Sequence, residues 1–184
     1  MMVLIERLQA IVGPGGRTSD PQELQPHLTE WRGVYEGRAL IMVRPRTTAE
    51  VVAIVRACAD SDTAIVPQGG NTGMCGGAVP DASGEQVILN LSRMNRVLDV
   101  DAENFSMTVQ AGCLLATAQE AARAAGRYFP LSLGAEGSCQ IGGNIATNAG
   151  GINVGRYGTA RALVLGLEVV LADGTVLDNL RSLR

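Results

Sequence analysis

A glycine-rich stretch at residues 67–77, PQGGNTGMCGG, holds the residues of this chain best suited to binding a ligand. Successive backbone N–H groups with few side chains between them form a concave nest for an anion. The sequence contains no lysine, since its 15 cations are all arginine, so the donors must be backbone amides helped by Asn71 and Thr72. Charge-assisted hydrogen bonds contribute roughly 1.5 to 3 kcal/mol each, so such a loop could hold a diphosphate.

The missing residue types exclude several other chemistries. Without lysine there is no Schiff-base anchor and no Walker phosphate loop. The glycine pair at residues 13–15 is interrupted by Pro14 and follows no strand pattern, so a Rossmann fingerprint also fails. His27 is the single histidine, which excludes a Ser-His-Asp triad and a multi-histidine metal site. We expect His27 to be an ordinary surface or partly packed residue.

A second glycine-rich stretch lies at residues 130–158 and alternates glycine with serine, threonine and asparagine. Small polar residues let a chain run against an extended ligand while they donate hydrogen bonds. An alternative stays open for both stretches: their glycines could simply make tight turns and bulges between packed strands. In either case we expect loops with a defined shape inside a fold, because the stretches are too apolar for solvent linkers.

The elements around these loops indicate an α+β fold. Residues 39–45, 47–58 and 64–67 form a predicted strand, helix and strand, joined as a parallel unit. Further strands are expected at 86–91 and, as a meander, at 96–101 and 106–112. A helix is predicted at 114–126, and two more strands at 161–178 around an Asp-Gly turn.

Composition limits the possible binding partners and the cellular location of the protein. The chain has 184 residues with a net charge of −3, enough for one domain or one domain plus a fragment, and it carries no electrostatic footprint for nucleic acid or an anionic membrane. The four cysteines are widely spaced and are expected to be small hydrophobic residues in a reducing compartment. The apolar run at the N-terminus is too short for a membrane span and lacks a cleavage site. We therefore expect a cytoplasmic protein.

Several motifs in one order resemble a known family. They are PQGGNTGMCGG, ILNLSRMNRVLDVD, VQAGC, PLSLGAEGSCQIGGNIATNAGG, RYG and LGLEVVLADGTVL. Together they resemble the FAD-binding domain of the vanillyl-alcohol oxidase or PCMH-type flavoproteins, especially the D-2-hydroxyglutarate dehydrogenase, D-lactate dehydrogenase and glycolate oxidase FAD-subunit group. The resemblance implies a PCMH-type FAD-binding fold, in which a parallel βαβ subdomain is followed by a subdomain with a mixed or antiparallel sheet. Residues 1–38 would be a helical extension and 39–184 an incomplete FAD-binding domain.

The resemblance also implies which residues line the cofactor. In the first stretch these are Pro67, Gln68, Gly69, Gly70, Asn71, Thr72, Gly73 and Met74. In the second they are Leu133, Gly134, Gly137, Ser138, Gly142, Gly143, Ala146, Thr147, Asn148, Gly151, Tyr157 and Gly158, with Val169 on a later strand. Asn71 stands where many relatives carry a histidine bonded covalently to FAD, so the resemblance implies non-covalent FAD.

In this family the flavin accepts a hydride at N5 from a D-2-hydroxy acid and passes the electrons to an acceptor, which the sequence does not identify. The residues that bind substrate or metal belong to a C-terminal domain that this chain lacks, so we assign no catalytic or metal-binding residue and hypothesise a truncated flavoprotein. Two alternatives remain: a non-catalytic FAD-binding module that needs a partner chain, and a flavin reductase of cell-wall synthesis. Arg156 or Arg161 could clamp an anion, although surface arginines are usually solvated.

Overall fold

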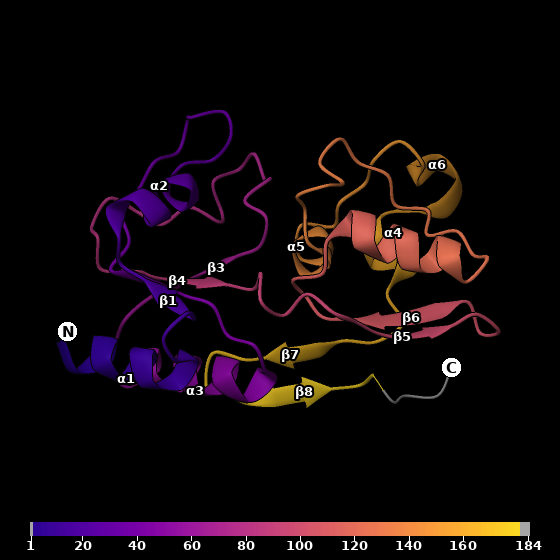
Figure 1. Cartoon of the computed structure of the whole chain (residues 1–184). Coiled ribbons are helices and arrows are strands. Elements are labelled where there is room, and N and C mark those ends of the chain that lie inside the picture. The colour runs from indigo at the N-terminus through magenta and orange to yellow at the C-terminus, as the bar shows by residue number, and fades with distance from the viewer. Residues whose placement is uncertain (1, 181–184) are drawn as a thin grey trace. The chain divides into compact units, whose positions relative to one another are not determined.

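A computed structural model describes residues 2–180, which form two compact units (Figure 1). The first unit contains the described residues up to Arg93 together with Glu168–Leu177. The second contains Met94–Leu167 and the described residues from Asp178 onward. Each unit is described by itself below.

A four-stranded sheet lies at the centre of the first unit. Its strands, in spatial order, are β1 (Arg17–Thr18), β2 (Ile41–Val43), β4 (Val87–Asn90) and β3 (Ile65–Gln68). β1 is antiparallel to β2, whereas β2 and β3 are both parallel to β4. The predicted parallel unit is thus confirmed, with β4 inserted between its two strands. The fully buried β2 and β4 match the continuous apolar runs in the sequence.

Helices cover both faces of this sheet. α1 (Met2–Val12) and α3 (Thr48–Ala59) lie together on one face, and α2 (Pro21–Leu28) lies on the other (Figure 1). α3 begins where the sequence predicts, because the Thr47 side chain accepts a hydrogen bond from the Glu50 N–H at 3.2 Å. On the opposite face Leu24 of α2 packs against Met42 and Ile88.

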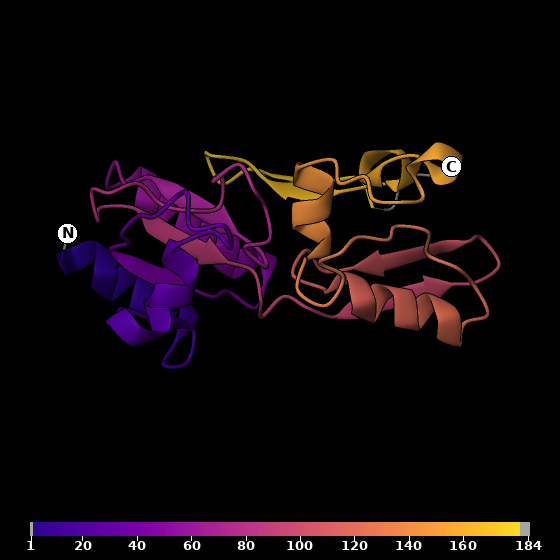
Figure 2. The same ribbon diagram turned by 90° about the horizontal axis from the view of Figure 1, so that it is seen from above.

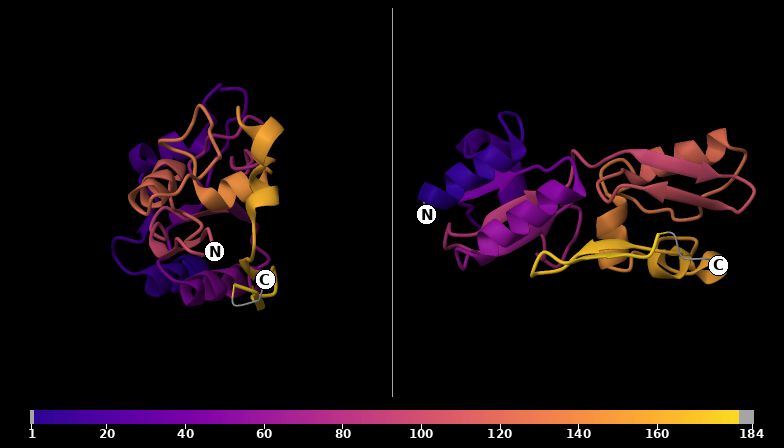
Figure 3. Two further views of the ribbon diagram at one scale, coloured as in Figure 1. Left: turned by 90° about the vertical axis from the view of Figure 1, so that its right-hand side faces the viewer. Right: turned by 90° about the horizontal axis from the view of Figure 1, so that it is seen from below.

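A separate two-stranded sheet, β7 (Glu168–Val170) and β8 (Val176–Asp178), is drawn in yellow in Figure 3. Its turn contacts α3, where Arg56 Nη2 donates to the carbonyl of Gly174 at 3.3 Å. The prediction that strand begins at residue 161 is wrong. Ala160–Leu163 instead forms the 3-10 helix η1, in which Arg161 bonds to Asn148 and to the end of an earlier helical segment rather than to a strand.

The second unit is built on an antiparallel pair, β5 (Val97–Asp101) and β6 (Ser106–Val109), which confirms the predicted meander. The predicted helix is α4 (Leu115–Ala124), which contacts β5 (Figure 2). Leu115, Ala118 and Leu131 belong to the buried core of this unit. None of the described helices is long and apolar enough to cross a membrane.

Two short helices interrupt the second glycine-rich stretch, which the sequence predicts to be loop throughout. They are α5 (Ile141–Ala146) and α6 (Val154–Tyr157). Glycine is a poor helix former. Because of the Gly142–Gly143 pair, helix propensity alone does not predict α5. Packing explains the helix: a Cβ at Gly142 would lie only 2.8 Å from the Cβ of Ala111, so glycine permits close contact between these two segments.

Candidate cofactor-binding segments

The predicted phosphate loop, residues 67–77, starts at the end of β3 in the first unit. Within the part of the chain that the structure describes, no backbone N–H from Gly69 to Ala78 donates a hydrogen bond to a protein acceptor. Backbone donors in folded proteins are nearly always paired with protein or water. These donors are therefore free to bond to water or to a ligand, and their role in binding a diphosphate stays a prediction.

Carbonyl groups of the same loop are, in contrast, held by the protein. The carbonyl of Gln68 accepts from the N–H of Leu91 at 3.1 Å, and the carbonyl of Gly69 accepts from Asn90 Nδ2 at 3.4 Å. The carbonyl of Met74 accepts from Nη2 of Arg32. Fixing these carbonyls limits rotation of the peptide planes, which leaves the N–H groups free for an anion.

Gln68 is a structural residue beneath the loop in this conformation, since only 1% of it is exposed. Its Nε2 donates to the carbonyls of His27 and Ala78 at 2.9 and 2.8 Å. Its Oε1 must then be an acceptor, and it lies 2.6 Å from Nδ1 of His27 and 3.3 Å from Nδ2 of Asn90. His27 therefore carries a proton on Nδ1, and it is partly packed as expected.

Asn71 has a left-handed backbone with φ of 51°, a conformation that asparagine tolerates better than most residues. Its Nδ2 donates to the carbonyl of Thr29 at 2.9 Å and faces that of Pro26 at 3.4 Å. Gly73 lies on the exposed side of the loop, and a Cβ there would meet no atom within 4 Å. The loop thus offers open space above its backbone at this position.

A groove of about 490 Å³ adjoins the loop within the first unit. Pro67, Gly76 and Gly77 line it from the loop side, and Tyr35 lines it from another segment. Gly76 is required here because its φ is +73° and a Cβ would lie 2.7 Å from the Tyr35 ring. The ring and the loop are therefore in direct contact.

In the second unit, the predicted positions from Leu133 to Ser138 form a turn closed by Glu136. The Glu136 carboxylate accepts from Ser132 Oγ at 2.7 Å and from the Leu133 N–H at 3.1 Å. Hydrogen bonds from the side chains of Ser132 and Gln119 and from the Leu133 backbone outweigh desolvation and lower the pKa of Glu136. This carboxylate is therefore ionised and holds the turn.

The predicted cofactor-lining glycines of the second stretch fall into two groups. A Cβ at Gly151 would lie 1.9 Å from the Ser132 carbonyl oxygen, and one at Gly158 would lie 2.9 Å from the Ala162 Cβ, as tight as the contact at Gly142. These three glycines are needed by the fold. A Cβ would meet nothing within 4 Å at a second group, which consists of Gly134, Gly137 and Gly143, so these positions offer space for a ligand.

The end of α5 is capped by side chains. Thr147 Oγ1 donates to the carbonyl of Gly143 at 2.8 Å, and Asn148, with φ of 53°, accepts from the N–H of Arg161 at 3.1 Å. Arg161 donates to the carbonyls of Ile145 and Ala146 at 3.0 and 2.7 Å. Arg161 is therefore a helix-capping residue in this conformation, as its place after a helix favours.

The sequence does not predict two buried polar residues, one at the start of α5 and one within it. Gln140 and Asn144 are 6% and 5% exposed, and their side-chain oxygens Oε1 and Oδ1 have no donor within the described structure. An unsatisfied buried acceptor costs about 1 to 3 kcal/mol. The sequence signal was weak, because two amides beside a glycine pair are also typical of an exposed loop.

Tyr157 and Val169 are two further predicted positions. Tyr157 packs edge-on against Tyr128 at 6.0 Å between ring centroids, with the Arg156 guanidinium 5.2 Å from the Tyr157 ring. Val169 lies on β7 and is 38% exposed. The predicted positions thus form two sets: the phosphate loop and Val169 in the first unit, and the others in the second.

Among the described residues, no group of three or more His, Cys, Asp or Glu side chains could hold a metal ion.

Comparison with known proteins decides the family. Residues 39–179 match the model of a family described as "FAD binding domain". The chain belongs to this FAD-binding family. FAD, the cofactor that the resemblance implied, is therefore confirmed.

Two relatives of the chain are named D-2-hydroxyglutarate dehydrogenase, mitochondrial. The protein of Bos taurus is 49% identical over 173 residues, which cover 94% of this chain and 31% of the relative. That of Arabidopsis thaliana is 41% identical over 180 residues, which cover 98% and 32%. The chain thus spans about a third of the length of these relatives.

A solved structure of p-cresol methylhydroxylase with substrate bound has a TM-score of 0.82 to the chain at 24% identity, covering 96% of this chain and 34% of that one. This likeness confirms the α+β fold of PCMH type. The expectation of a cytoplasmic location is wrong, because both named relatives are mitochondrial proteins. The N-terminal pattern on which that expectation rested concerns secretion and membrane spans only.

Proposed function

We propose that the chain is the FAD-binding portion of a dehydrogenase that oxidises a D-2-hydroxy acid. The observation that carries the cofactor part is the run of unpaired N–H groups in the phosphate loop. Relatives named D-2-hydroxyglutarate dehydrogenase support the substrate class. The substrate pocket and the electron acceptor would involve parts of the relatives that lie outside the matched third.

The loop residues of the first unit would hold the diphosphate through their backbone N–H groups. Bound FAD would supply the hydride-accepting ring. We propose that it binds non-covalently, because Asn71 offers no nucleophile and its amide is hydrogen-bonded to the Thr29 carbonyl.

The test is a titration followed by reduction. Purified chain is titrated with FAD by calorimetry, and the loaded protein then receives D-2-hydroxyglutarate or D-lactate without oxygen while flavin absorbance is recorded. Binding of FAD with release of free flavin on denaturation is expected. Absence of binding would contradict the cofactor assignment to these residues.

The second step separates two candidates. Bleaching of the flavin would mean that this chain carries the dehydrogenase reaction itself. An unchanged spectrum would favour a FAD-binding module that needs further protein for its substrate pocket, a candidate supported by the coverage of about a third of the relatives.

A further inference from the structure

We propose that residues 26–35, here called the anchor segment, position the phosphate loop for a diphosphate, with Arg32 as the main positioning residue. The inference rests on the proposed FAD site and goes beyond it, because the family match begins at residue 39 and does not include this segment. It also gives a role to part of the region that the sequence predicts to be only a helical extension.

The anchor segment contacts the loop at three successive points. Near the start of the loop, the carbonyl of His27 accepts from Gln68 Nε2 at 2.9 Å. In the middle, the carbonyl of Thr29 accepts from Asn71 Nδ2 at 2.9 Å. Further along, Arg32 donates to the carbonyl of Met74. The two segments are therefore joined along most of the loop.

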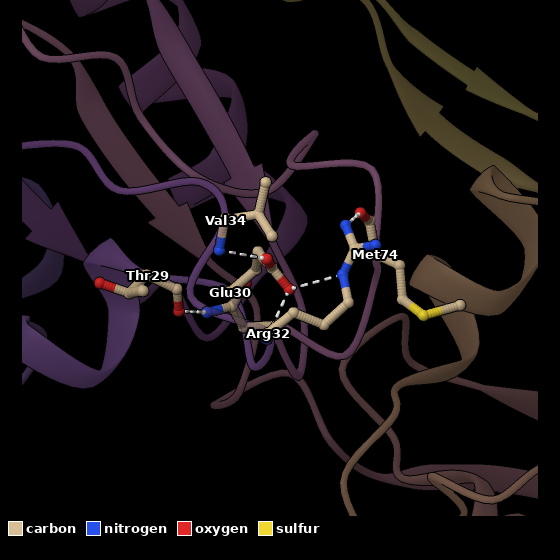
Figure 4. Close-up of polar contacts among 6 residues, drawn as sticks. Thr29, Glu30, Arg32, Val34 and Met74 are labelled. Carbon is tan, nitrogen blue, oxygen red and sulfur yellow. Dashed lines mark hydrogen bonds and ion pairs between the residues drawn. The ribbon is translucent and has the colours of Figure 1, made fainter.

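Glu30 holds Arg32 in place from within the unit (Figure 4). It is only 2% exposed, and its carboxylate accepts from the N–H groups of Arg32 and Val34 at 2.8 and 2.9 Å and faces Arg32 Nε at 3.5 Å. A buried carboxylate is retained only when it is paired and hydrogen-bonded. Its position fixes both the backbone turn and the direction in which the arginine points.

The anchor contacts leave the ligand-binding groups of the loop untouched. They use two side-chain amides and one carbonyl of the loop, and none of its backbone N–H groups. A surface that held the loop through its N–H groups would compete with an anion. The anchor segment instead restricts the loop while keeping those donors available, which lowers the ordering cost of binding.

Arg38 provides a matched control. It also donates to a backbone carbonyl, that of Ala82, from Nε at 2.9 Å and from Nη2 at 2.6 Å. It lies in the same unit but contacts a turn outside residues 67–77. Loss of either arginine removes one exposed cation and its contact with a backbone carbonyl, and loss of Arg32 also removes the ion pair with Glu30.

The experiment compares Arg32→Ala, Arg32→Lys and Arg38→Ala with the wild-type chain. The FAD dissociation constant is measured by calorimetry, and in FAD-free protein the {1H}-15N heteronuclear NOE is measured for the amides of residues 69–77. For Arg32→Ala we expect an affinity about tenfold weaker and lower NOE values in the loop. Arg32→Lys should restore part of both, and Arg38→Ala should change neither.

The outcomes separate the anchor from the cofactor proposal. Wild-type affinity and wild-type NOE values in Arg32→Ala would overturn the anchor role, and so would equal effects of Arg32→Ala and Arg38→Ala. Failure of the wild-type chain to bind FAD would overturn the proposed function, while the NOE values would still decide whether Arg32 positions the loop. If Arg32→Ala does not fold, the comparison of Arg32→Lys with Arg38→Ala decides in the same way.

Discussion

The two glycine-rich regions use the same residue type for different purposes. In the phosphate loop, the backbone N–H groups are unpaired and a Cβ at Gly73 would enter open space. In the second region, several N–H groups are used in turns and in α5, and Gly142 and Gly151 are pressed against other backbone segments. Gly73 thus leaves open space beside the loop, whereas Gly142 and Gly151 permit contact between chain segments. Each region also holds the other kind of glycine, since Gly76 is pressed against the Tyr35 ring and Gly134, Gly137 and Gly143 are open.

This difference separates glycines with open space beside them, which are the candidates for binding, from glycines that the fold requires. The two regions have similar compositions. They differ in the atoms that a Cβ would meet at each glycine and in whether each backbone N–H has a protein acceptor. Substitutions in the two regions should therefore affect different measurements.

The largest effect is expected for Gly151→Ala. Its φ of +88° disfavours any side chain, and the added Cβ would lie 1.9 Å from the Ser132 carbonyl oxygen. We expect a loss of about 3 kcal/mol or more in the free energy of unfolding, measured by urea denaturation. Gly155→Ala is the control, because its Cβ would meet nothing within 4 Å, and its stability should stay within about 0.5 kcal/mol of wild type. Equal stabilities of the two variants would refute the packing role.

Gly73→Val should show the opposite pattern. Because its Cβ enters open space, the unfolding free energy should change by no more than about 0.5 kcal/mol. The branched side chain would cover neighbouring N–H groups, so the FAD dissociation constant from calorimetry should rise about ten- to a hundredfold. A stable variant with unchanged affinity would remove the phosphate loop from the proposed site.

A smaller effect is expected for the reactivity of the cysteines, which can be measured without substituting a glycine. Burial raises the pKa of Cys58 to about 11 and also raises the pKa of Cys113 and Cys139, whereas Cys75 in the phosphate loop is exposed. Since the thiolate is the reactive form, one thiol per native chain should react rapidly with a disulfide reagent. Cys75→Ser should abolish this rapid reaction. In the wild-type chain, bound FAD should slow it severalfold. An undiminished rate with FAD bound would place the cofactor away from Cys75.

The smallest effect is a change of stability with pH. Burial opposes ionisation of Glu30, but the N–H groups of Arg32 and Val34 and the Arg32 charge together lower its pKa below the ordinary value of 4.5. A lowered native pKa stabilises the fold above the unfolded value and loses this contribution as pH falls through the native value. Wild-type stability should therefore fall more steeply than that of Glu30→Gln below about pH 4.5.

Guanidinium denaturation between pH 7 and pH 3 measures this difference. Glu85→Gln, an exposed carboxylate in the same unit, serves as the control and should follow the wild-type curve. Parallel curves for wild type and Glu30→Gln would contradict a stabilising carboxylate in the anchor segment.

Local patterns predict most of the elements because they depend on neighbouring residues. The apolar run of β2, the Thr47 cap of α3 and the glycine after α4 each act over a few positions. The loop at residues 67–77 is also predicted, since its glycines follow a strand directly, whereas its binding of phosphate stays a prediction. Prediction fails at α5, where packing against Ala111 overrides the low helix propensity of two glycines.

The contacts between the anchor segment and the loop cannot be predicted from sequence patterns, for a different reason. Arg32 and Met74 are separated by 42 positions, and the contact depends on where α2 ends relative to β3. Nothing in the local sequence distinguishes Glu30 from a solvent-exposed carboxylate, although only 2% of it is exposed. Only the tertiary fold shows which charged side chains serve the loop.

The position of β4 between β2 and β3 ties the segment that carries the phosphate loop to the central sheet. The loop leaves β3, and the chain returns through β4, which pairs in parallel with β3 and with β2. The central sheet therefore closes the chain segment between β3 and β4, which contains the loop. The conformational entropy of loop closure is lost during folding, so an arriving dinucleotide would meet a curved peptide whose ends are already fixed.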